Sequence, residues 1–319
     1  MAQRTTDWLL LETFSTHSSA TVIAQGVTTK AFLPLEKIIR SATHRTIVET
    51  AVEAIRRDPF PRDFIQGDHR YIFRPLQEYN HELAGILFHY GPTTDPVQDP
   101  PACGAWSFNL ERGLAISSDA MHDLHRVPES RRFKSRPIHE SLSRIVGPDP
   151  TATAKLIHKR PGATHQATET ITSEDGSLWT AAYSAGFVLQ SDGSVGVRGI
   201  TRRIGDYQSR PTPAALSDQV LRASSQSGVF RTIIDPTTGT FLRSYDPPFT
   251  PGAREAGQVV ADPDEATTLL SLIHNCAVDN VAITSVSMHS PDFMPVNIDL
   301  FPLDVDGVRA VLANFSRRK

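Results

Sequence analysis

Residues 174–204 read EDGSLWTAAYSAGFVLQSDGSVGVRGITRRI, and they carry the clearest structural signal in the chain. Residues 178–188 and 195–204 are both rich in aromatic and β-branched side chains, which favour strands. Asp192-Gly193 lies between these two runs, and both residues tolerate the positive φ of a tight hairpin turn. The segment therefore predicts two long antiparallel strands joined by a short turn.

Similar strand pairs recur on either side of this hairpin. Residues 295–315 contain two strand-forming runs around Asp306-Gly307, and residues 70–90 contain a weaker pair. Strand–turn–strand openings are predicted at 104–117 and 228–243, and helices at 35–57, 138–146, 150–159 and 263–278.

Two proline-rich segments divide the chain into blocks of similar length. Proline lacks a backbone N–H and fixes φ, so residues 93–102 and 206–213 are expected to be linkers. They separate three expected domains, which are residues 1–92, 103–205 and 214–319. Three blocks of similar size that end on similar strand pairs indicate an internal repeat.

The middle block resembles a PAS domain. The resemblance rests on six segments of this block. They are the first strand 106–110, the start of the central helix 148–150, the middle strand 168–171, the two Asp-Gly turns at 175–176 and 192–193, and the end of the last strand 199–204. The outer blocks are PAS- or GAF-like in element order, and the whole arrangement is similar to uncharacterised actinobacterial proteins with PAS/GAF-like modules. The resemblance implies an α+β fold of three modules, each an antiparallel sheet flanked by short helices.

The same resemblance implies a function. PAS domains often hold a ligand cavity between helices and sheet, sense small molecules, light or redox state, and dimerise or dock to partners. No recognisable kinase, cyclase, phosphatase or DNA-binding output region follows Ile204. We therefore expect either that the third block transmits the signal or that another protein supplies the output.

Composition and apolar runs bear on three other classes: nucleic-acid-binding, disulfide-stabilised and membrane proteins. The formal charge of −3 gives no basic face for nucleic acid. Cys103 and Cys276 are the only cysteines, which excludes a disulfide scaffold and fits a reducing cytosol. The apolar run from Trp8 is interrupted at Glu12, so it is too short for a signal peptide or a membrane span. We expect a soluble, cytoplasmic protein that binds neither nucleic acid nor membranes.

Aromatic strand residues are the candidates for lining a ligand cavity. The alternative, that they form the core or a dimer face, stays open at this point. Strand periodicity places Trp179 and Tyr183 on one face, and Trp106 and Phe108 on one face, but does not say which face is inward. The candidates are Trp106, Phe108, Trp179, Tyr183 and Phe187.

No cofactor is required by the sequence. Haem-binding PAS domains use a histidine on the central helix, and His158 occupies the matching region, although one of twelve scattered histidines falls there readily by chance. Neither cysteine matches the motif of a flavin photosensor. His122 and His125 share one helical face, but further zinc ligands are lacking, so a surface helix turn and no metal site are predicted.

Catalytic signatures are missing. The nucleophile elbow, the Walker-type phosphate loop, the dinucleotide glycine motif and the His-Glu-x-x-His zinc motif do not occur. We therefore expect a sensory or regulatory adaptor instead of an enzyme, one that binds a small ligand, a protein partner or both, or self-associates. The alternatives are a ligand-free interaction scaffold and, after it, a haem sensor or an unrecognised enzyme.

Overall fold

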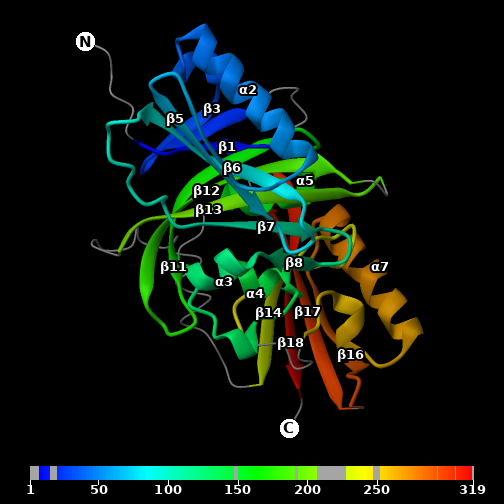
Figure 1. Cartoon of the computed structure of the whole chain (residues 1–319). Helices are drawn as coiled ribbons and strands as arrows, with labels where there is room; N and C mark the ends of the chain where they lie inside the picture. The colour runs from blue at the N-terminus through cyan, green and yellow to red at the C-terminus, as the bar shows by residue number, and fades with distance from the viewer. Residues whose placement is uncertain are drawn as a thin grey trace.

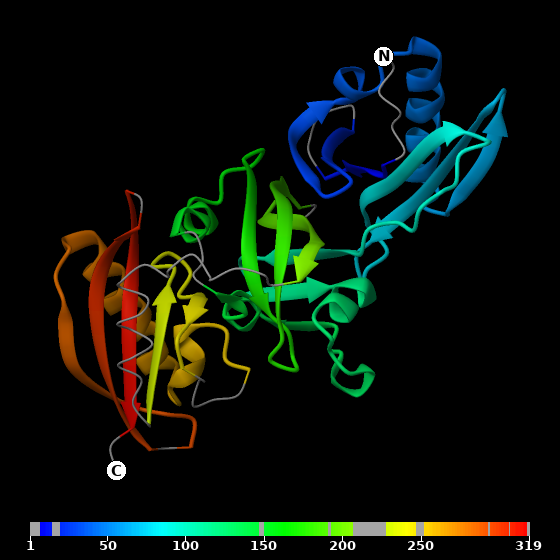
Figure 2. The ribbon, with the colours of Figure 1, turned by 90° about the vertical axis from the view of Figure 1, so that its left-hand side faces the viewer.

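The computed structural model contains three antiparallel β-sheets that follow one another along the chain, each with helices (Figure 1). Figure 2 shows them in a row, with the middle sheet between the other two. The expected α+β class is confirmed. Within the described part of the chain, no helix is long and apolar enough to cross a membrane. The structure describes residues 7–14, 20–146, 150–190, 193–206, 228–246, 252–292, 294–305 and 307–317.

The first sheet has six strands in the order β3-β2-β1-β6-β5-β4, and helix α2 covers one of its faces (Figure 1). Helix α2 begins after Ser41, whose side chain accepts a hydrogen bond from the backbone N–H of His44, a favourable N-cap. Its apolar side buries Val48, Val52 and Ile55. The elements are β1 (Leu9–Glu12), β2 (Thr21–Gln25), β3 (Thr28–Pro34), α1 (Leu35–Ile38), α2 (Ala42–Arg57), β4 (Arg62–Gln66), β5 (His69–Gln77) and β6 (Leu83–Pro92).

The middle sheet has seven strands in the order β10-β11-β12-β13-β7-β8-β9. The predicted hairpin is confirmed as β12 and β13, which pair from Trp179–Asp206 to Leu189–Val195. Asp192 of the predicted turn lies outside the described residues. The elements are β7 (Cys103–Asn109), β8 (Leu114–Ser117), α3 (Asp119–Leu124), the 3-10 helix η1 (Glu129–Arg131), β9 (Ser135–Pro137), α4 (Ile138–Leu142), β10 (Ile145–Val146), α5 (Pro150–His158), β11 (Thr164–Thr172), β12 (Leu178–Leu189) and β13 (Val195–Asp206).

The third sheet has five strands in the order β15-β14-β18-β17-β16 and packs against α7. Helix α7 starts with Pro263 in its first turn and stops at Asn280, whose φ of 56° is left-handed. Between these ends it buries Leu269, Ile273 and Cys276. The elements are β14 (Val229–Ile234), β15 (Phe241–Ser244), the 3-10 helix η2 (Ala256–Val259), α7 (Pro263–Asp279), β16 (Ile283–His289), β17 (Pro295–Val305) and β18 (Val308–Arg317).

The three sheets share one connectivity. Five strands of the first, β2-β1-β6-β5-β4, correspond in order to β8-β7-β13-β12-β11 of the middle sheet and to β15-β14-β18-β17-β16 of the third. Strands β3, β9 and β10 are additions at sheet edges. In every sheet two strands open the core, helices follow, and three strands close it. The repeat therefore extends to the block fronts, where the sequences compare poorly.

Several elements differ from the sequence prediction. The helix expected at 35–57 is two helices, because the backbone is extended at Ile39. The helix expected at 138–146 ends at Leu142, and Ile145–Val146 pairs with β11 as a short strand instead. Strands β1–β4 and β16 were not predicted. Strands β1 and β2 are buried on both faces, whereas β3, β4 and β16 are largely exposed, so none of them shows the apolar–polar alternation that marks a half-buried strand.

The two predicted linkers have different outcomes. Residues 93–102 pack against the first sheet: the indole N–H of Trp8 donates to the carbonyl oxygen of Gln98 at 2.8 Å, and Val97 packs on the adjoining apolar cluster. Of residues 206–213, Asp206 ends β13, and the others lie outside the described residues.

The first and middle sheets share an apolar interface. In β1, Leu9 and Leu11 face α2, whereas Leu10 joins Ala105 and Ile200 of the middle sheet in a separate cluster. The close approach requires Gly85, because a Cβ there would lie 2.4 Å from the Ile200 side chain. Strands of the first sheet are therefore buried on both faces.

Candidate functional site

A cavity of about 130 Å³ lies on the helix-covered face of the middle sheet. Strands β7, β11, β12 and β13 form its floor, and residues of α3, α4, α5 and the neighbouring loops form its other walls. Trp106, Phe108, Tyr183 and Phe187, four of the five aromatic candidates, line it. The sequence alone did not show which face of these strands points inward. The structure shows that the faces carrying these four side chains point into the cavity.

Trp179 and His158 do not line the cavity. Trp179 is fully buried further along the sheet, with its ring centroid 5.7 Å from that of His125 and the Arg203 guanidinium over its face. His158 is exposed at the end of α5 and is not among the residues that line the cavity.

The aromatic wall is held by contacts between neighbouring strands. The Trp106 ring lies tilted beside Phe108 of the same strand, with centroids 4.7 Å apart, and its indole N–H donates to Thr201 Oγ1 of β13 at 2.9 Å. The ring lies across Gly199 of the adjacent strand, where a Cβ would be 2.3 Å from the ring. The glycine of the Gly-Ile-Thr-Arg ending therefore makes room for this tryptophan.

Two histidines of the α3 segment also line the cavity. The expected surface helix turn is present, since Asp119, Ala120 and Asp123 are exposed, but its His122 side chain is 4% exposed and lines the cavity. Nδ1 of His125 is buried and has no hydrogen-bond partner among the described residues. Burial, with the nearby Arg144 and Arg136, lowers the pKa of His125 to about 3, so its imidazole is neutral at physiological pH.

Cationic side chains outnumber carboxylates around the cavity. Among the described residues that line it are four cations, Arg136, Arg144, Lys155 and Arg243, and one carboxylate, that of Glu169. Arg144 forms an ion pair with Glu174, and this contact lowers the pKa of the Glu174 carboxyl. Arg136, in contrast, makes no side-chain hydrogen bond or ion pair with the residues that the structure describes.

A second polar group lies where α5 faces β11 and β12. Lys155 Nζ donates to His165 Nδ1 at 2.9 Å, which leaves the proton of the neutral imidazole on Nε2. Nε2 then donates to the Tyr183 hydroxyl oxygen at 3.0 Å. The chain fixes the orientation of three polar side chains along one wall of the cavity.

The third block contributes directly to the site. Arg243 of β15 lines the cavity, and Leu242 joins the apolar cluster of Phe108 and Phe187. Buried His139 of α4 is held by this block too: its Nε2–H donates to the Ala253 carbonyl oxygen at 2.9 Å. Since a carbonyl only accepts, the neutral ring must accept at Nδ1, and Ser244 Oγ donates to it at 3.0 Å.

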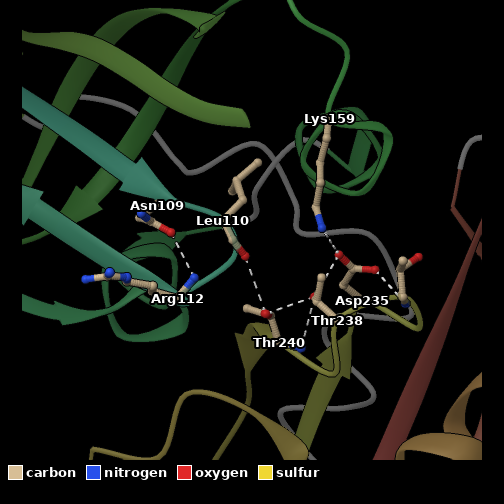
Figure 3. Close-up of polar contacts among 8 residues, drawn as sticks. Asn109, Leu110, Arg112, Lys159, Asp235, Thr238 and Thr240 are labelled. Carbon is tan, nitrogen blue, oxygen red and sulfur yellow. Dashed lines mark hydrogen bonds and ion pairs between the residues drawn. The ribbon is translucent and has the colours of Figure 1, made fainter. Parts of the chain in front are cut away.

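A second set of polar contacts joins the two blocks beside the cavity (Figure 3). Lys159, just past α5, pairs at 2.7 Å with Asp235, whose side chain is 1% exposed. Asp235 also accepts hydrogen bonds from Thr238 and from the backbone N–H of Thr237, which fixes the turn between β14 and β15. These contacts join α5, which covers the cavity, to the turn that precedes β15, the strand that carries Arg243.

The cysteines offer no reactive group. Cys103 is buried at the start of β7, and burial raises the pKa of its thiol to about 12. Cys276 is buried in α7. Both thiols are therefore protonated and inert at neutral pH. Within the ranges that the structure describes, no group of three or more His, Cys, Asp or Glu side chains is placed to hold a metal ion.

Comparison with known proteins places the fold. Residues 7–101 match the family described as Rv3651-like, N-terminal. A crystal structure of an uncharacterized protein from Mycobacterium tuberculosis superposes with a TM-score of 0.79 and 19% identity, covering 98% of this chain and 97% of that one. The two chains thus share an overall fold. No curated protein matches the chain.

Sensory proteins are also similar, more distantly. A sensory box histidine kinase/response regulator from Burkholderia thailandensis has a TM-score of 0.25 and 14% identity, over 39% of this chain and 88% of that one. The periplasmic sensory domain of a Campylobacter jejuni chemoreceptor has a TM-score of 0.26 and 10% identity, over 68% and 73%. Neither likeness is close enough to bear on function.

Sequence reasoning missed the polar half of the site. Arg136, His125 and Arg243 lie on three separate segments, and only the fold brings them to one cavity. The spacing of His122 and His125 places them on one helical face, but it does not show that this face is turned toward the cavity.

Proposed function

We propose that the chain is a cytoplasmic, non-catalytic sensory or regulatory protein made of three PAS-type modules, residues 1–92, 103–205 and 214–319. In this proposal the middle module binds a small molecule. Two strands, a helical middle and a return to an antiparallel sheet is the order of a PAS domain, and each of the three sheets follows it. The cavity lies between helices and sheet, where the resemblance implies a ligand.

The single observation that carries the proposal is a cavity with an apolar floor to which the next module contributes a wall residue. A ligand that contacts Arg243 touches both modules at once. Such a ligand can favour one packing of β15 against the middle module over another, provided that its affinity differs between the two packings. The third module would then transmit the occupancy of the cavity.

The output is assigned to a partner protein or to self-association. The third module has the same strand order as the other two, so it resembles a further sensory or docking module more than a distinct effector. A ligand-free scaffold is the competing function, and retention of a ligand separates the two.

Native mass spectrometry of the full chain, purified without refolding, tests ligand binding. We expect a bound species of low mass that is lost from two variants that fill the cavity from opposite walls. Ala185→Leu extends from the sheet and Ala152→Leu from α5, so a folding failure in one leaves the other as a test. Wild-type protein without any bound species, or retention in both filled variants, contradicts the proposal.

Hydrogen exchange tests the transmission. Removing the ligand is expected to increase amide exchange in β12, which forms the floor, and also in β15 of the third module. Strand β16 of the third sheet is the internal control, because it lies at the far edge of that sheet, pairs with β17 and contributes no residue to the cavity. A change confined to β12 means that the third module does not respond to the ligand.

A further inference from the structure

The charge around the cavity points to the chemical class of the ligand. Among the described residues, four cationic side chains and one carboxylate line the space, and the Arg144 charge is already matched by Glu174. Arg136 forms no ion pair and no side-chain hydrogen bond with the described residues, and the carboxylates of Glu140 and Glu174 act on it only from a greater distance. Partly burying an unmatched guanidinium is costly, and an anion placed beside it offsets that cost.

The neighbourhood of Arg136 strengthens this charge argument. The electrostatic influence of both Arg136 and Arg144 is felt at His125, so these groups lie near one another at one end of the cavity. Nδ1 of His125 is buried there without a partner among the described residues. A neutral imidazole can carry its proton on this nitrogen and donate it to an acceptor in the cavity.

The rest of the cavity suits an apolar body. Away from the arginines the floor consists of Trp106, Phe108 and Phe187 with alanines between them. A volume of about 130 Å³ admits a molecule of the size of a small aromatic ring with its substituent, well below the several hundred cubic ångströms typical of drug-sized sites.

We infer that the middle module binds a small organic carboxylate, with its head group beside Arg136 and its apolar body against the aromatic floor. This inference rests on the proposed function, because it specifies the ligand of the same cavity. A guanidinium matches a carboxylate in geometry as well as in charge. A neutral isostere of the same shape would cover Arg136 without pairing it, so the site should discriminate against it.

Calorimetric titration of the full chain, stripped of any ligand, tests the inference with matched pairs of probes. The acids are benzoate, phenylacetate and hexanoate, and each is compared with its primary amide, which has nearly the same shape and no charge. At least one acid is expected to bind about tenfold or more tightly than its amide, the usual contribution of a charge-assisted hydrogen bond.

Substitution then assigns the preference to one side chain. Arg136→Gln is expected to reduce the acid-to-amide ratio to less than about threefold while amide binding stays unchanged. Arg131→Gln is the matched control: it comes from the same segment, its side chain is 64% exposed and pairs with Glu174 outside the cavity lining, and Glu174 keeps Arg144 as a partner, so the ratio should persist. Arg136→Lys keeps the charge without the planar fork and should give an intermediate ratio, which covers the case of a misfolded glutamine variant.

The outcomes separate this inference from the proposed function. Amides that bind as tightly as acids, or a preference that survives Arg136→Gln, overturn the inference and leave a ligand-binding cavity. If no probe binds and the protein from cells carries no ligand either, both the proposed function and the carboxylate inference fail.

Discussion

Replacing His125 by phenylalanine is expected to make the folded state less sensitive to acid. The pKa of this imidazole is lowered from 6.5 to about 3 by burial and by Arg144 and Arg136, with Glu174 opposing them. Between these two pH values the unfolded chain binds a proton that the folded chain excludes. Stability is therefore lost as the pH falls below 6.5, and the loss is complete near pH 3.

The magnitude follows from the size of the shift. At pH 5 the pH is about 1.5 units below the ordinary pKa of the imidazole. Protonation of this one site therefore stabilises the unfolded state by about 2 kcal/mol, at roughly 1.4 kcal/mol per unit. The centroids of the His125 and Trp179 rings are 5.7 Å apart. Phenylalanine at position 125 keeps a ring beside Trp179 but has no group that titrates. The free energy of unfolding of His125→Phe should thus decline by about 2 kcal/mol less than that of wild type between pH 7.5 and 5.

Urea unfolding followed by tryptophan fluorescence at each pH measures this difference. Trp179→Phe is the control, because it disturbs the same packing but keeps the imidazole: its stability should be lower at every pH while the dependence on pH is retained. NMR titration of the histidine ring protons gives a direct check. The reasoning is refuted if the signal lost in His125→Phe titrates near pH 6.5 in the wild type, or if the two stability curves run parallel.

Two further changes test the packing around the site. Gly199→Ala places a methyl group against the Trp106 ring, so we expect a loss of about 1–3 kcal/mol and a shifted tryptophan emission; an unchanged spectrum would mean that the ring does not lie across the glycine. Glu78→Gln breaks a pair with Arg198 at 2.5 Å in which the glutamate side chain is 2% exposed, and should cost about 2 kcal/mol by thermal melting. Glu82→Gln is its control, because Glu82 lies 3.4 Å from the same arginine but is 59% exposed, and a loss equal to that of Glu78→Gln would contradict the role of burial.

Local sequence patterns were sufficient for the long elements. The β12–β13 hairpin and helix α7 were predicted close to their observed bounds, because strand alternation, turn residues and helical spacing act within a few neighbouring residues. The aromatic floor of the cavity was predicted for the same reason: Trp106, Phe108, Tyr183 and Phe187 lie on well-marked strands.

Elements that depend on distant partners were not predictable in this way. Strand β10 has two residues and exists because Ile145 and Val146 pair with β11. Strand β1 is apolar on both faces, since Leu9 and Leu10 belong to different cores, so it shows no alternation. Such segments have no local period from which the sheet could be inferred.

The sequence by itself determined the α+β class, the repeat of strand pairs and the aromatic candidates, because each depends on side chains that are neighbours along the chain. Only the tertiary structure decided which polar side chains surround the cavity. Arg243 is more than a hundred residues away from His125 and Arg136 in the sequence, the three share no motif, and two different blocks must pack together before they surround one space. Burial and charge around that space are properties of the packing, and they suppress the protonation of His125 and leave Arg136 without a direct ion pair among the described residues.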